Sequence, residues 1–256
     1  MFRERKSRMQ ASKLEFRLRM WIMIAIVFVG FWAPWSSAVG LRRGESLLGW
    51  LAAEISRTTG LLPFSQAAPW LIVAGAVAAA LGAWLRVWGA AYLGYGTVHH
   101  GQMQAHTMMA DGPYRFVRNP LYLGGWFMML AVSLLMPAAG APVAMVLMTL
   151  FFLRLILAEE VFLAGELGEP YREYLKDVPR LFPRLRGSLP AAGNKPIWLT
   201  AVITEVNPIG IFFAFAFLSW NYDVQLMLKG ILVSFGLSLI LRALFLNRKN
   251  EDPNAA

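Results

Sequence analysis

Long apolar stretches alternate with short polar and basic segments along most of the chain. The apolar stretches cover approximately residues 20–39, 69–92, 121–136, 143–157, 197–220 and 224–246. A helix needs about 20 apolar residues to cross the hydrocarbon core of a bilayer, and most of these stretches approach that length. Because backbone polar groups must be satisfied within lipid, the pattern favours helices. The sequence therefore predicts an all-α, polytopic membrane protein with about six transmembrane helices.

The segments between the stretches predict how the chain is organised. Residues 137–142 begin and end with proline and predict a tight turn, so the third and fourth stretches form a helical hairpin. The apolar patch at 47–53 is too short to span and predicts an interfacial helix. We expect three regions along the chain: residues 1–68, a basic segment, a first transmembrane helix and an interfacial loop; residues 69–190, the core; and residues 191–256, an appended transmembrane hairpin.

Composition and charge support a membrane location. The chain is 57% hydrophobic and 15% charged, against about 45–50% and about 25% in soluble domains. Its net charge is +9 and it has no cysteine, which excludes disulfides and thiolate metal sites. Cytoplasmic loops facing anionic lipid account for the positive charge without nucleic acid as a partner. Residues 20–39 are longer than the apolar part of a signal peptide and no A-x-A site follows, so we expect a retained anchor.

The positive-inside rule predicts the orientation. The segments placed on the cytoplasmic side are residues 1–19, 93–120, 164–196 and 247–256. This assignment leaves only three arginines, Arg42, Arg43 and Arg57, in the outside loops. Since basic residues gather in cytoplasmic loops, we expect both termini and the polar centre of the protein to face the cytoplasm.

A rigid cationic segment, residues 112–125, directly precedes the third apolar stretch. Pro113 and Pro120 hold their preceding residues in extended conformations, and Pro120 suits the first turn of a helix. The free N–H groups of that turn favour an anion. Arg115 and Arg118 add cations that can grip carboxylate or phosphate. The segment predicts either an anion site or merely a basic loop that obeys the topology rule.

Two adjacent glycines and two adjacent glutamates flank the third and fourth stretches. Gly124 and Gly125 leave room for either a ligand or a neighbouring helix. Glu159 and Glu160 fall at the predicted C-terminus of the fourth helix, where the helix dipole disfavours negative charge. Two buried carboxylates also raise each other's pKa. We therefore expect a cationic partner, either an arginine on a neighbouring element or a cationic ligand.

Three residues inside apolar stretches are unusual for a lipid environment. Arg86 lies in the last third of the second stretch, where it either snorkels to the cytoplasmic interface or has a function. Glu205 and Pro208 lie in the fifth stretch. Glu205 either belongs to a substrate site or snorkels. The hairpin that contains it is expected to wall a lipid-facing entrance or to form a homodimer contact.

Several motifs in a fixed order resemble a known family over residues 85–186. They are Leu85-Arg86-Val87-Trp88, Leu93-Gly94, His106, Gly112-Pro113-Tyr114-Arg115, Arg118-Asn119-Pro120-Leu121-Tyr122-Leu123-Gly124, Glu159-Glu160, Gly168-Glu169-Pro170-Tyr171-Arg172-Glu173-Tyr174 and Val178-Pro179-Arg180. The series resembles the isoprenylcysteine carboxyl methyltransferase and phospholipid methyltransferase family of integral-membrane enzymes. No single motif is specific, but their order and spacing are.

The resemblance implies S-adenosyl-L-methionine as the cofactor, bound on the cytoplasmic side. The residues it implies for the pocket are His106, Thr107 and Met108 near the adenosyl part, then Tyr114, Arg115, Arg118, Asn119, Pro120, Tyr122, Gly124, Glu159, Glu160, Tyr171 and Tyr174. Arg118, Asn119 and Glu160 are the implied catalytic residues. Asn119 stands where the family commonly has histidine, and asparagine keeps a hydrogen bond but cannot carry a proton as a base.

The implied reaction is in-line methyl transfer to a lipophilic or lipid acceptor that enters laterally from the bilayer. Such transfer depends on alignment and desolvation. A carboxylate acceptor needs no general base, whereas an amine or thiol must lose a proton. The alternatives are a catalytically altered ligand-binding or structural membrane protein, and a transporter, which the lack of inverted repeats disfavours. The three histidines, His99, His100 and His106, lack partners at metal-ligand spacing, so we expect no metal. We expect the protein in a bacterial inner membrane.

Overall fold

The described part of the chain is helical. The computed structural model describes residues 10–32, 45–60, 62–93, 111–184, 189, 193–221 and 223–245. Its elements are α1 (Lys13–Arg17), α2 (Arg19–Trp32), α3 (Leu47–Thr59), α4 (Phe64–Leu93), η1 (Gly112–Arg115), α6 (Pro120–Ser133), α7 (Gly140–Leu167), α8 (Glu169–Asp177), α9 (Trp198–Thr204), α10 (Val206–Phe217), η2 (Leu218–Asn221) and α11 (Val224–Phe245). One isolated bridge, Ser46 with Pro137, is the only β pairing among these residues. The all-α prediction is confirmed.

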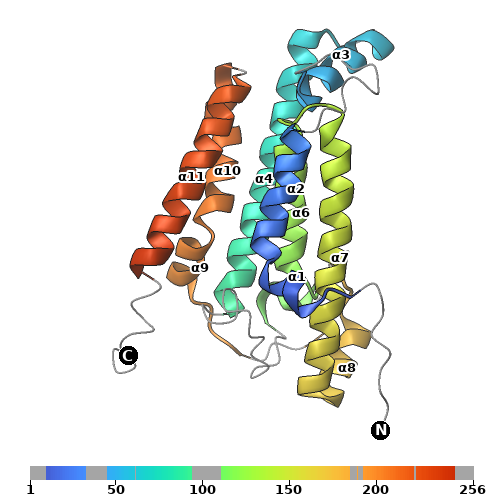
Figure 1. Cartoon of the computed structure of the whole chain (residues 1–256), viewed down its shortest axis with the longest axis vertical. Helices are drawn as coiled ribbons and strands as arrows, with labels where there is room; N and C mark the ends of the chain where they lie inside the picture. Colours follow the sequence, from blue (N-terminus) through green and yellow to red (C-terminus); the bar gives the residue numbers. More distant parts are fainter. Residues whose placement is uncertain are drawn as a thin grey trace.

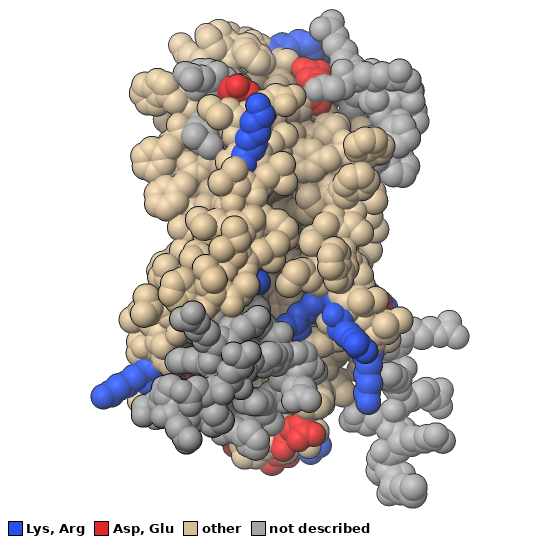
Figure 2. Space-filling view, turned by 60° about the vertical axis from the view of Figure 1, so that its left-hand side comes forward, with Lys and Arg blue, Asp and Glu red and all other residues tan. Residues whose placement is uncertain are grey.

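The long helices run side by side between two ends of the molecule (Figure 1). By length and composition α4, α7 and α11 can each cross a membrane, and α9 with α10 makes a fourth span if the bent pair counts as one. On the face in Figure 2, charged side chains gather toward the two ends and leave a broad, largely uncharged band between them. The protein is thus a polytopic membrane protein.

Six full spans are not confirmed by the described residues. α2 and α6 are apolar but have 14 residues each, which is about 21 Å of helix and less than a hydrocarbon core. The third apolar stretch leaves the helix at Ser133, while α7 extends beyond the predicted stretch at both ends. α3 confirms a helix after residue 46 and continues past the apolar patch to Thr59.

α1, α8 and the C-terminal end of α11 lie at one end of the molecule, and α3 lies at the other (Figure 1). We call the end of the molecule that holds α8 the η1 end; it comprises residues 111–118, α8 and residues 178–184.

Glu15 of α1 pairs with Arg154 of α7 at 2.9 Å. The hydrogen bond from Arg154 lowers the pKa of Glu15 to about 2. This ion pair ties the start of the described chain to α7.

α4 and α6 pack closely at a glycine contact. A Cβ added to Gly82 would lie 2.8 Å from the carbonyl oxygen of Gly124, and one added to Gly124 would lie 2.8 Å from the carbonyl oxygen of Gly82. Small residues permit such backbone approach in membrane proteins. Of the two roles expected for Gly124, the structure shows contact with a neighbouring helix.

The fifth apolar stretch is broken rather than straight. α9 and α10 meet at Glu205 with a bend of 68°. Pro208 has no N–H to bond the carbonyl of Thr204 four residues earlier. Arg242 of α11 donates to that carbonyl instead, at 2.5 Å. The break therefore leaves the carbonyl group of Thr204 without its helical hydrogen bond, and α11 supplies a donor for it.

Candidate active site

The cationic segment forms a short turn followed by an extended piece. Gly112 has φ of 54°, and a Cβ there would clash with the ring of Tyr92, so the position requires glycine. Pro113 is the second residue of the one-turn helix η1. The chain then pairs with residues 178–184, since the N–H of Arg118 donates to Pro179 at 2.9 Å and the N–H of Arg184 donates to Phe116 at 3.1 Å. Residues 114–119 form no α-helix, but Gly112 is left-handed and not extended as expected before Pro113.

Arg118 and Glu160 form the centre of a buried network. Arg118 donates to Glu160 at 3.1 Å, to the carbonyl oxygen of Val178 at 2.5 Å and to that of Leu175. Glu160 also accepts from Arg180, with the shortest distance 2.7 Å. Only 6% of Glu160 is exposed. The network joins the segment that follows η1 to α7 and to the end of α8.

This network corrects one expectation and decides another. The glutamate pair does not lie at the C-terminus of its helix, because α7 continues to Leu167, roughly two turns further on. The dipole at a helix C-terminus therefore does not explain why these glutamates have a cationic partner. For Glu160 the cationic partner is arginine, supplied by Arg118 and Arg180 on neighbouring elements.

Asn119 and Pro120 make the junction between the turn and α6. Asn119 is the N-cap residue of α6, but its side chain makes no cap hydrogen bond. Its amide nitrogen instead donates to the carbonyl oxygen of Arg180 at 3.2 Å. Pro120 occupies the first turn of α6, where a missing N–H costs nothing. Asn119 thus braces the 178–184 segment, a role that needs no titratable group.

Glu159 faces a different partner from Glu160. Tyr122 of α6 donates its hydroxyl to Oε1 of Glu159 at 2.7 Å. No hydrogen bond from a described residue reaches Oε2 of Glu159. The two glutamates are therefore distinct: Glu160 is saturated by arginine, while Glu159 keeps acceptor capacity.

Three tyrosines surround the network. The hydroxyl of Tyr174 donates to the carbonyl oxygen of Tyr114 at 2.8 Å, and the rings of Tyr171 and Tyr174 lie 5.6 Å apart. Burial raises the pKa of all three, so each is a neutral donor at physiological pH. The buried hydroxyl of Tyr114 has no hydrogen-bond partner in the described residues. Unpaired buried groups are rare and indicate a missing partner.

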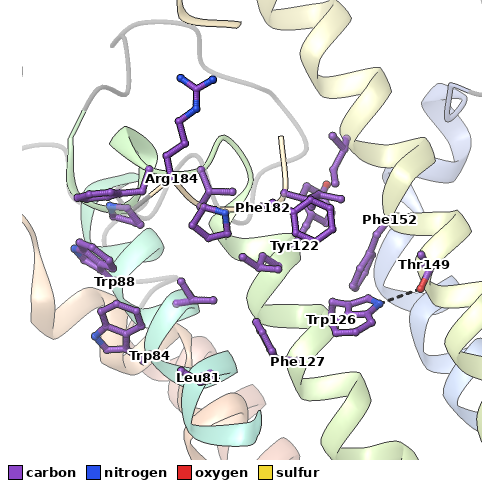
Figure 3. A pocket seen from close by; sticks show the side chains of 18 of the residues that line it. Leu81, Trp84, Trp88, Tyr122, Trp126, Phe127, Thr149, Phe152, Phe182 and Arg184 are labelled. Carbon is purple, nitrogen blue, oxygen red and sulfur yellow. Dashed lines mark hydrogen bonds between the residues drawn. The ribbon is translucent and has the colours of Figure 1, made fainter. Parts of the chain in front are cut away.

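A cavity of about 680 Å³ lies beside these residues, between α4, α6 and α7 and under the η1 end. Its lining is Leu81, Trp84, Leu85, Trp88, Pro113, Phe116, Val117, Tyr122, Leu123, Trp126, Phe127, Thr149, Phe152, Leu153, Ile156, Leu181, Phe182, Pro183 and Arg184. Trp84 and Trp88 of α4 face Trp126 and Phe152 across the cavity (Figure 3). Among the described lining residues, and apart from indole nitrogens, only Tyr122, Thr149 and Arg184 bring polar side-chain atoms to it.

The polar groups of the cavity are arranged at its edges. Trp126 donates to Thr149 at 3.0 Å (Figure 3), and Thr149 donates to the carbonyl oxygen of Met145. Arg184 extends away from the ring cluster (Figure 3). The interior of the cavity is therefore suited to an apolar chain, with polar contacts at Tyr122 and at the η1 end.

The structure brings together most of the expected pocket residues. Arg118, Asn119, Pro120, Tyr122, Glu159, Glu160, Tyr114, Tyr171 and Tyr174 all lie at the η1 end or in the adjoining turns of α6 and α7. Arg115 is near them but donates to the carbonyl oxygen of Leu189 at 2.8 Å. His106, Thr107 and Met108 lie outside the described residues. Among the described residues no cluster of three or more His, Asp or Glu could hold a metal.

Two features of the site are not found by sequence reasoning. Arg180 shares Glu160 with Arg118, and only the fold brings it there. The aromatic lining has a weak sequence signal, because aromatic residues four apart share one face of a helix. Trp84 with Trp88, and Tyr122 with Trp126, follow this spacing.

Known proteins similar to the chain match its central part. A family model for phospholipid methyltransferase matches residues 70–169. The protein-S-isoprenylcysteine O-methyltransferase of Xenopus laevis is 30% identical over 151 residues, covering 56% of this chain and 50% of that protein. The one from Schizosaccharomyces pombe is 34% identical over 82 residues, covering 30% and 34%. The human one is 28% identical over 149 residues, covering 56% and 51%.

The matches cover only part of each relative. The chain spans about half the length of the frog and human relatives and about a third of the yeast one. No solved structure gives a significant match. The family match includes the motifs from Leu85 to Glu160 that carry the resemblance in the sequence. The chain is therefore similar to the phospholipid methyltransferase family over less than half of its length, and to protein-S-isoprenylcysteine O-methyltransferases over about half of it.

Proposed function

We propose that the protein is a membrane methyltransferase that uses S-adenosyl-L-methionine and methylates a lipophilic acceptor. The observation that carries the proposal is the apolar cavity of about 680 Å³ that ends at Tyr122, the partner of Glu159. An apolar chamber beside a partly buried carboxylate and hydroxyl can hold a lipid chain next to a polar reacting group. Its volume falls within the roughly 300–1,000 Å³ of small-molecule sites.

The residues present fit a cofactor that carries ammonium, sulfonium and ribose hydroxyl groups. Glu159 retains an oxygen for a cation or a hydroxyl, and Tyr114 has a buried hydroxyl without a described partner. When bound, the cofactor supplies an electrophilic methyl group, and its sulfur keeps the bonding electron pair. Arg118, Asn119 and Glu160 are engaged with protein groups, so we assign them to holding the site and assign ligand contact to Glu159, Tyr122 and Tyr114.

The acceptor we propose has an apolar body and an anionic or polar head, as in an isoprenylcysteine carboxylate or a lipid. A carboxylate oxygen can take the methyl group without a general base. Excluding water from an apolar chamber strengthens the electrostatic contacts that align the reacting atoms. Arg184 lines the η1 end of the cavity, and its guanidinium, which extends away from the rings and donates to the carbonyl oxygen of Asp177 at 3.0 Å, would have to turn to reach the head group.

We propose that the acceptor enters from the bilayer and that the η1 end faces the cytoplasm. Leu81 and Trp84 line the cavity and are also exposed, at 41% and 56%. They lie on α4, a helix long and apolar enough to cross a membrane. Large apolar side chains that are exposed on such a helix face lipid, so the cavity and the bilayer share one wall.

Calorimetry with S-adenosylhomocysteine tests the cofactor part of the proposal in purified protein. We expect saturable binding, at least tenfold weakened by Glu159→Gln. Glu166→Gln is the matched control, because Glu166 is an exposed carboxylate further along α7. Absence of binding by the unaltered protein, or equal loss in both variants, would refute the assignment.

Transfer of labelled methyl groups tests the acceptor part. The donor is S-adenosylmethionine, and the acceptors compared are N-acetyl-S-farnesylcysteine and a mixed phospholipid extract. Leu153→Trp adds bulk to a cavity wall and is expected to reduce transfer while S-adenosylhomocysteine still binds. Transfer unaffected by Leu153→Trp would show that the acceptor lies elsewhere.

A further inference from the structure

A buried ion pair joins the appended hairpin to the core. Arg86 of α4 donates from Nε to Oε2 of Glu205 at 2.6 Å and from its second terminal nitrogen to Oε1 at 3.0 Å. Glu205 is fully buried and Arg86 keeps 25% of its side chain exposed. Both residues were expected to snorkel as one alternative, and neither does. Glu205 stands outside the family match, which ends at residue 169.

The same arginine holds the first turn of α6. Its remaining terminal nitrogen donates to the carbonyl oxygen of Leu121 at 3.3 Å. A Cβ added to Gly124 would lie 2.6 Å from Cγ of Arg86, so the backbone of α6 rests directly on the arginine side chain. Tyr122 sits in this turn and donates to Glu159. Arg86 thus contacts both Glu205 and the helix turn that presents Tyr122.

The chain that leads to Glu205 is fixed to the core at two further points. The N–H of Ile197 donates to the carbonyl oxygen of Ala91 at 2.8 Å. The carboxylate of Asp111 accepts from the backbone N–H groups of Gly193 and Asn194, at 3.3 and 2.7 Å. These bonds attach the linker before α9 to the end of α4 and to Asp111, the residue directly before η1. Glu205 therefore has a defined place relative to Arg86.

We infer that Glu205 is a positioning residue for the methyl-transfer site: through Arg86 it fixes the first turn of α6 and so the contact of Tyr122 with Glu159. The inference rests on the proposed function for its meaning, but the geometry concerns this chain's residues alone. An arginine that loses its buried carboxylate is left as an uncompensated charge and must find another partner or water. The contacts of Arg86 with the carbonyl of Leu121 and with the backbone at Gly124 are then no longer held in place.

The test reports on Tyr122 directly. Tyr122 is replaced by 3-fluorotyrosine in the full chain, and its fluorine resonance is recorded in the parent protein and in Glu205→Gln, Arg86→Lys and Asn207→Ala. The first variant removes the charge with little change of shape, and the second keeps the charge but loses the fork of two hydrogen bonds. Asn207→Ala is the control, because it breaks a hydrogen bond to Ser234 within the same hairpin and leaves Arg86 untouched.

We expect Glu205→Gln and Arg86→Lys to shift or broaden the fluorine resonance and to weaken S-adenosylhomocysteine binding by about 2- to 30-fold, the range of coupling through contiguous contacts. The control is expected to match the parent in both. An unchanged resonance in both test variants, or an equal change in the control, overturns the inference. Should the parent protein bind no S-adenosylhomocysteine, the proposed function fails while the fluorine comparison still decides the positioning role.

Discussion

Truncation of Glu160 tests whether the two adjacent glutamates differ in role, Glu160 in holding the fold and Glu159 in contacting the proposed ligand. Glu160→Ala removes the acceptor shared by Arg118 and Arg180, whereas Glu159→Gln keeps an oxygen that can accept from Tyr122. We expect the first change to destabilise the fold strongly and the second to affect mainly ligand binding. The two residues are adjacent in the sequence, so each serves as a control for the other.

The magnitude follows from the burial of each partner. Breaking a buried ion pair by removing one partner costs about 3–5 kcal/mol. The Glu160 and Arg118 side chains are 8% and 14% exposed, which places their contact in this class. Arg118 keeps its bonds to the carbonyls of Val178 and Leu175, which lowers the cost to about 3 kcal/mol. Arg180 is 43% exposed, and such a screened pair adds at most about 1 kcal/mol.

Thermal unfolding in detergent, followed by tryptophan fluorescence, measures the difference. For a chain of this size 1 kcal/mol corresponds to about 2–4 °C, so a cost of about 3–4 kcal/mol is expected to lower the Tm of Glu160→Ala by roughly 6–16 °C. Glu159→Gln should lower it by less than about 4 °C. If both substitutions lower the Tm equally, the distinction between the two glutamates is wrong.

Three further predictions concern contacts outside this network. Glu15→Gln should cost about 1 kcal/mol at pH 7, since the ion pair with Arg154 is partly exposed. The lowered pKa of Glu15 makes its contribution complete above pH 4.5 and lost as the pH falls toward 2, so denaturant titrations of the two proteins should converge in acid. Gly124→Val should prevent close packing of α6 on α4, because even its Cβ lies 2.8 Å from a rigid backbone oxygen, and monodisperse protein should be lost in gel filtration, in contrast to Gly165→Ala at an open site. Thr149→Val leaves the indole N–H of Trp126 without its acceptor and should lower the free energy of unfolding by about 1–3 kcal/mol, while a Trp126→Phe background should abolish that cost.

The contact at Gly124 shows which part of the helix packing the local sequence can predict. A pair of glycines near a helix start indicates a close approach, and the sequence left open whether a ligand or a helix makes it. The approach of Gly82 to Gly124 needs two helices far apart in the chain. Nothing within either helix specifies which neighbour will lie there.

Span boundaries show a second limit. An apolar run indicates where a helix can lie in lipid but not where it ends, because the last turns are set by tertiary partners. α7 continues through polar residues to Leu167, and its Glu160 is stabilised there by Arg118 and Arg180. The fifth apolar stretch is bent, and the carbonyl that Pro208 leaves free is satisfied by Arg242 of another helix.

The sequence by itself determined the all-α membrane class, the resemblance to a methyltransferase family and most of the residues that lie together at the η1 end, because hydrophobic runs and motif spacing are local properties of the chain. Only the tertiary structure decided which charges pair. Glu160 takes two arginines, Glu159 takes Tyr122, and Glu205 takes Arg86 from 119 residues away. In an apolar interior a charge is stable only beside its partner, and the packing of distant helices determines that partner.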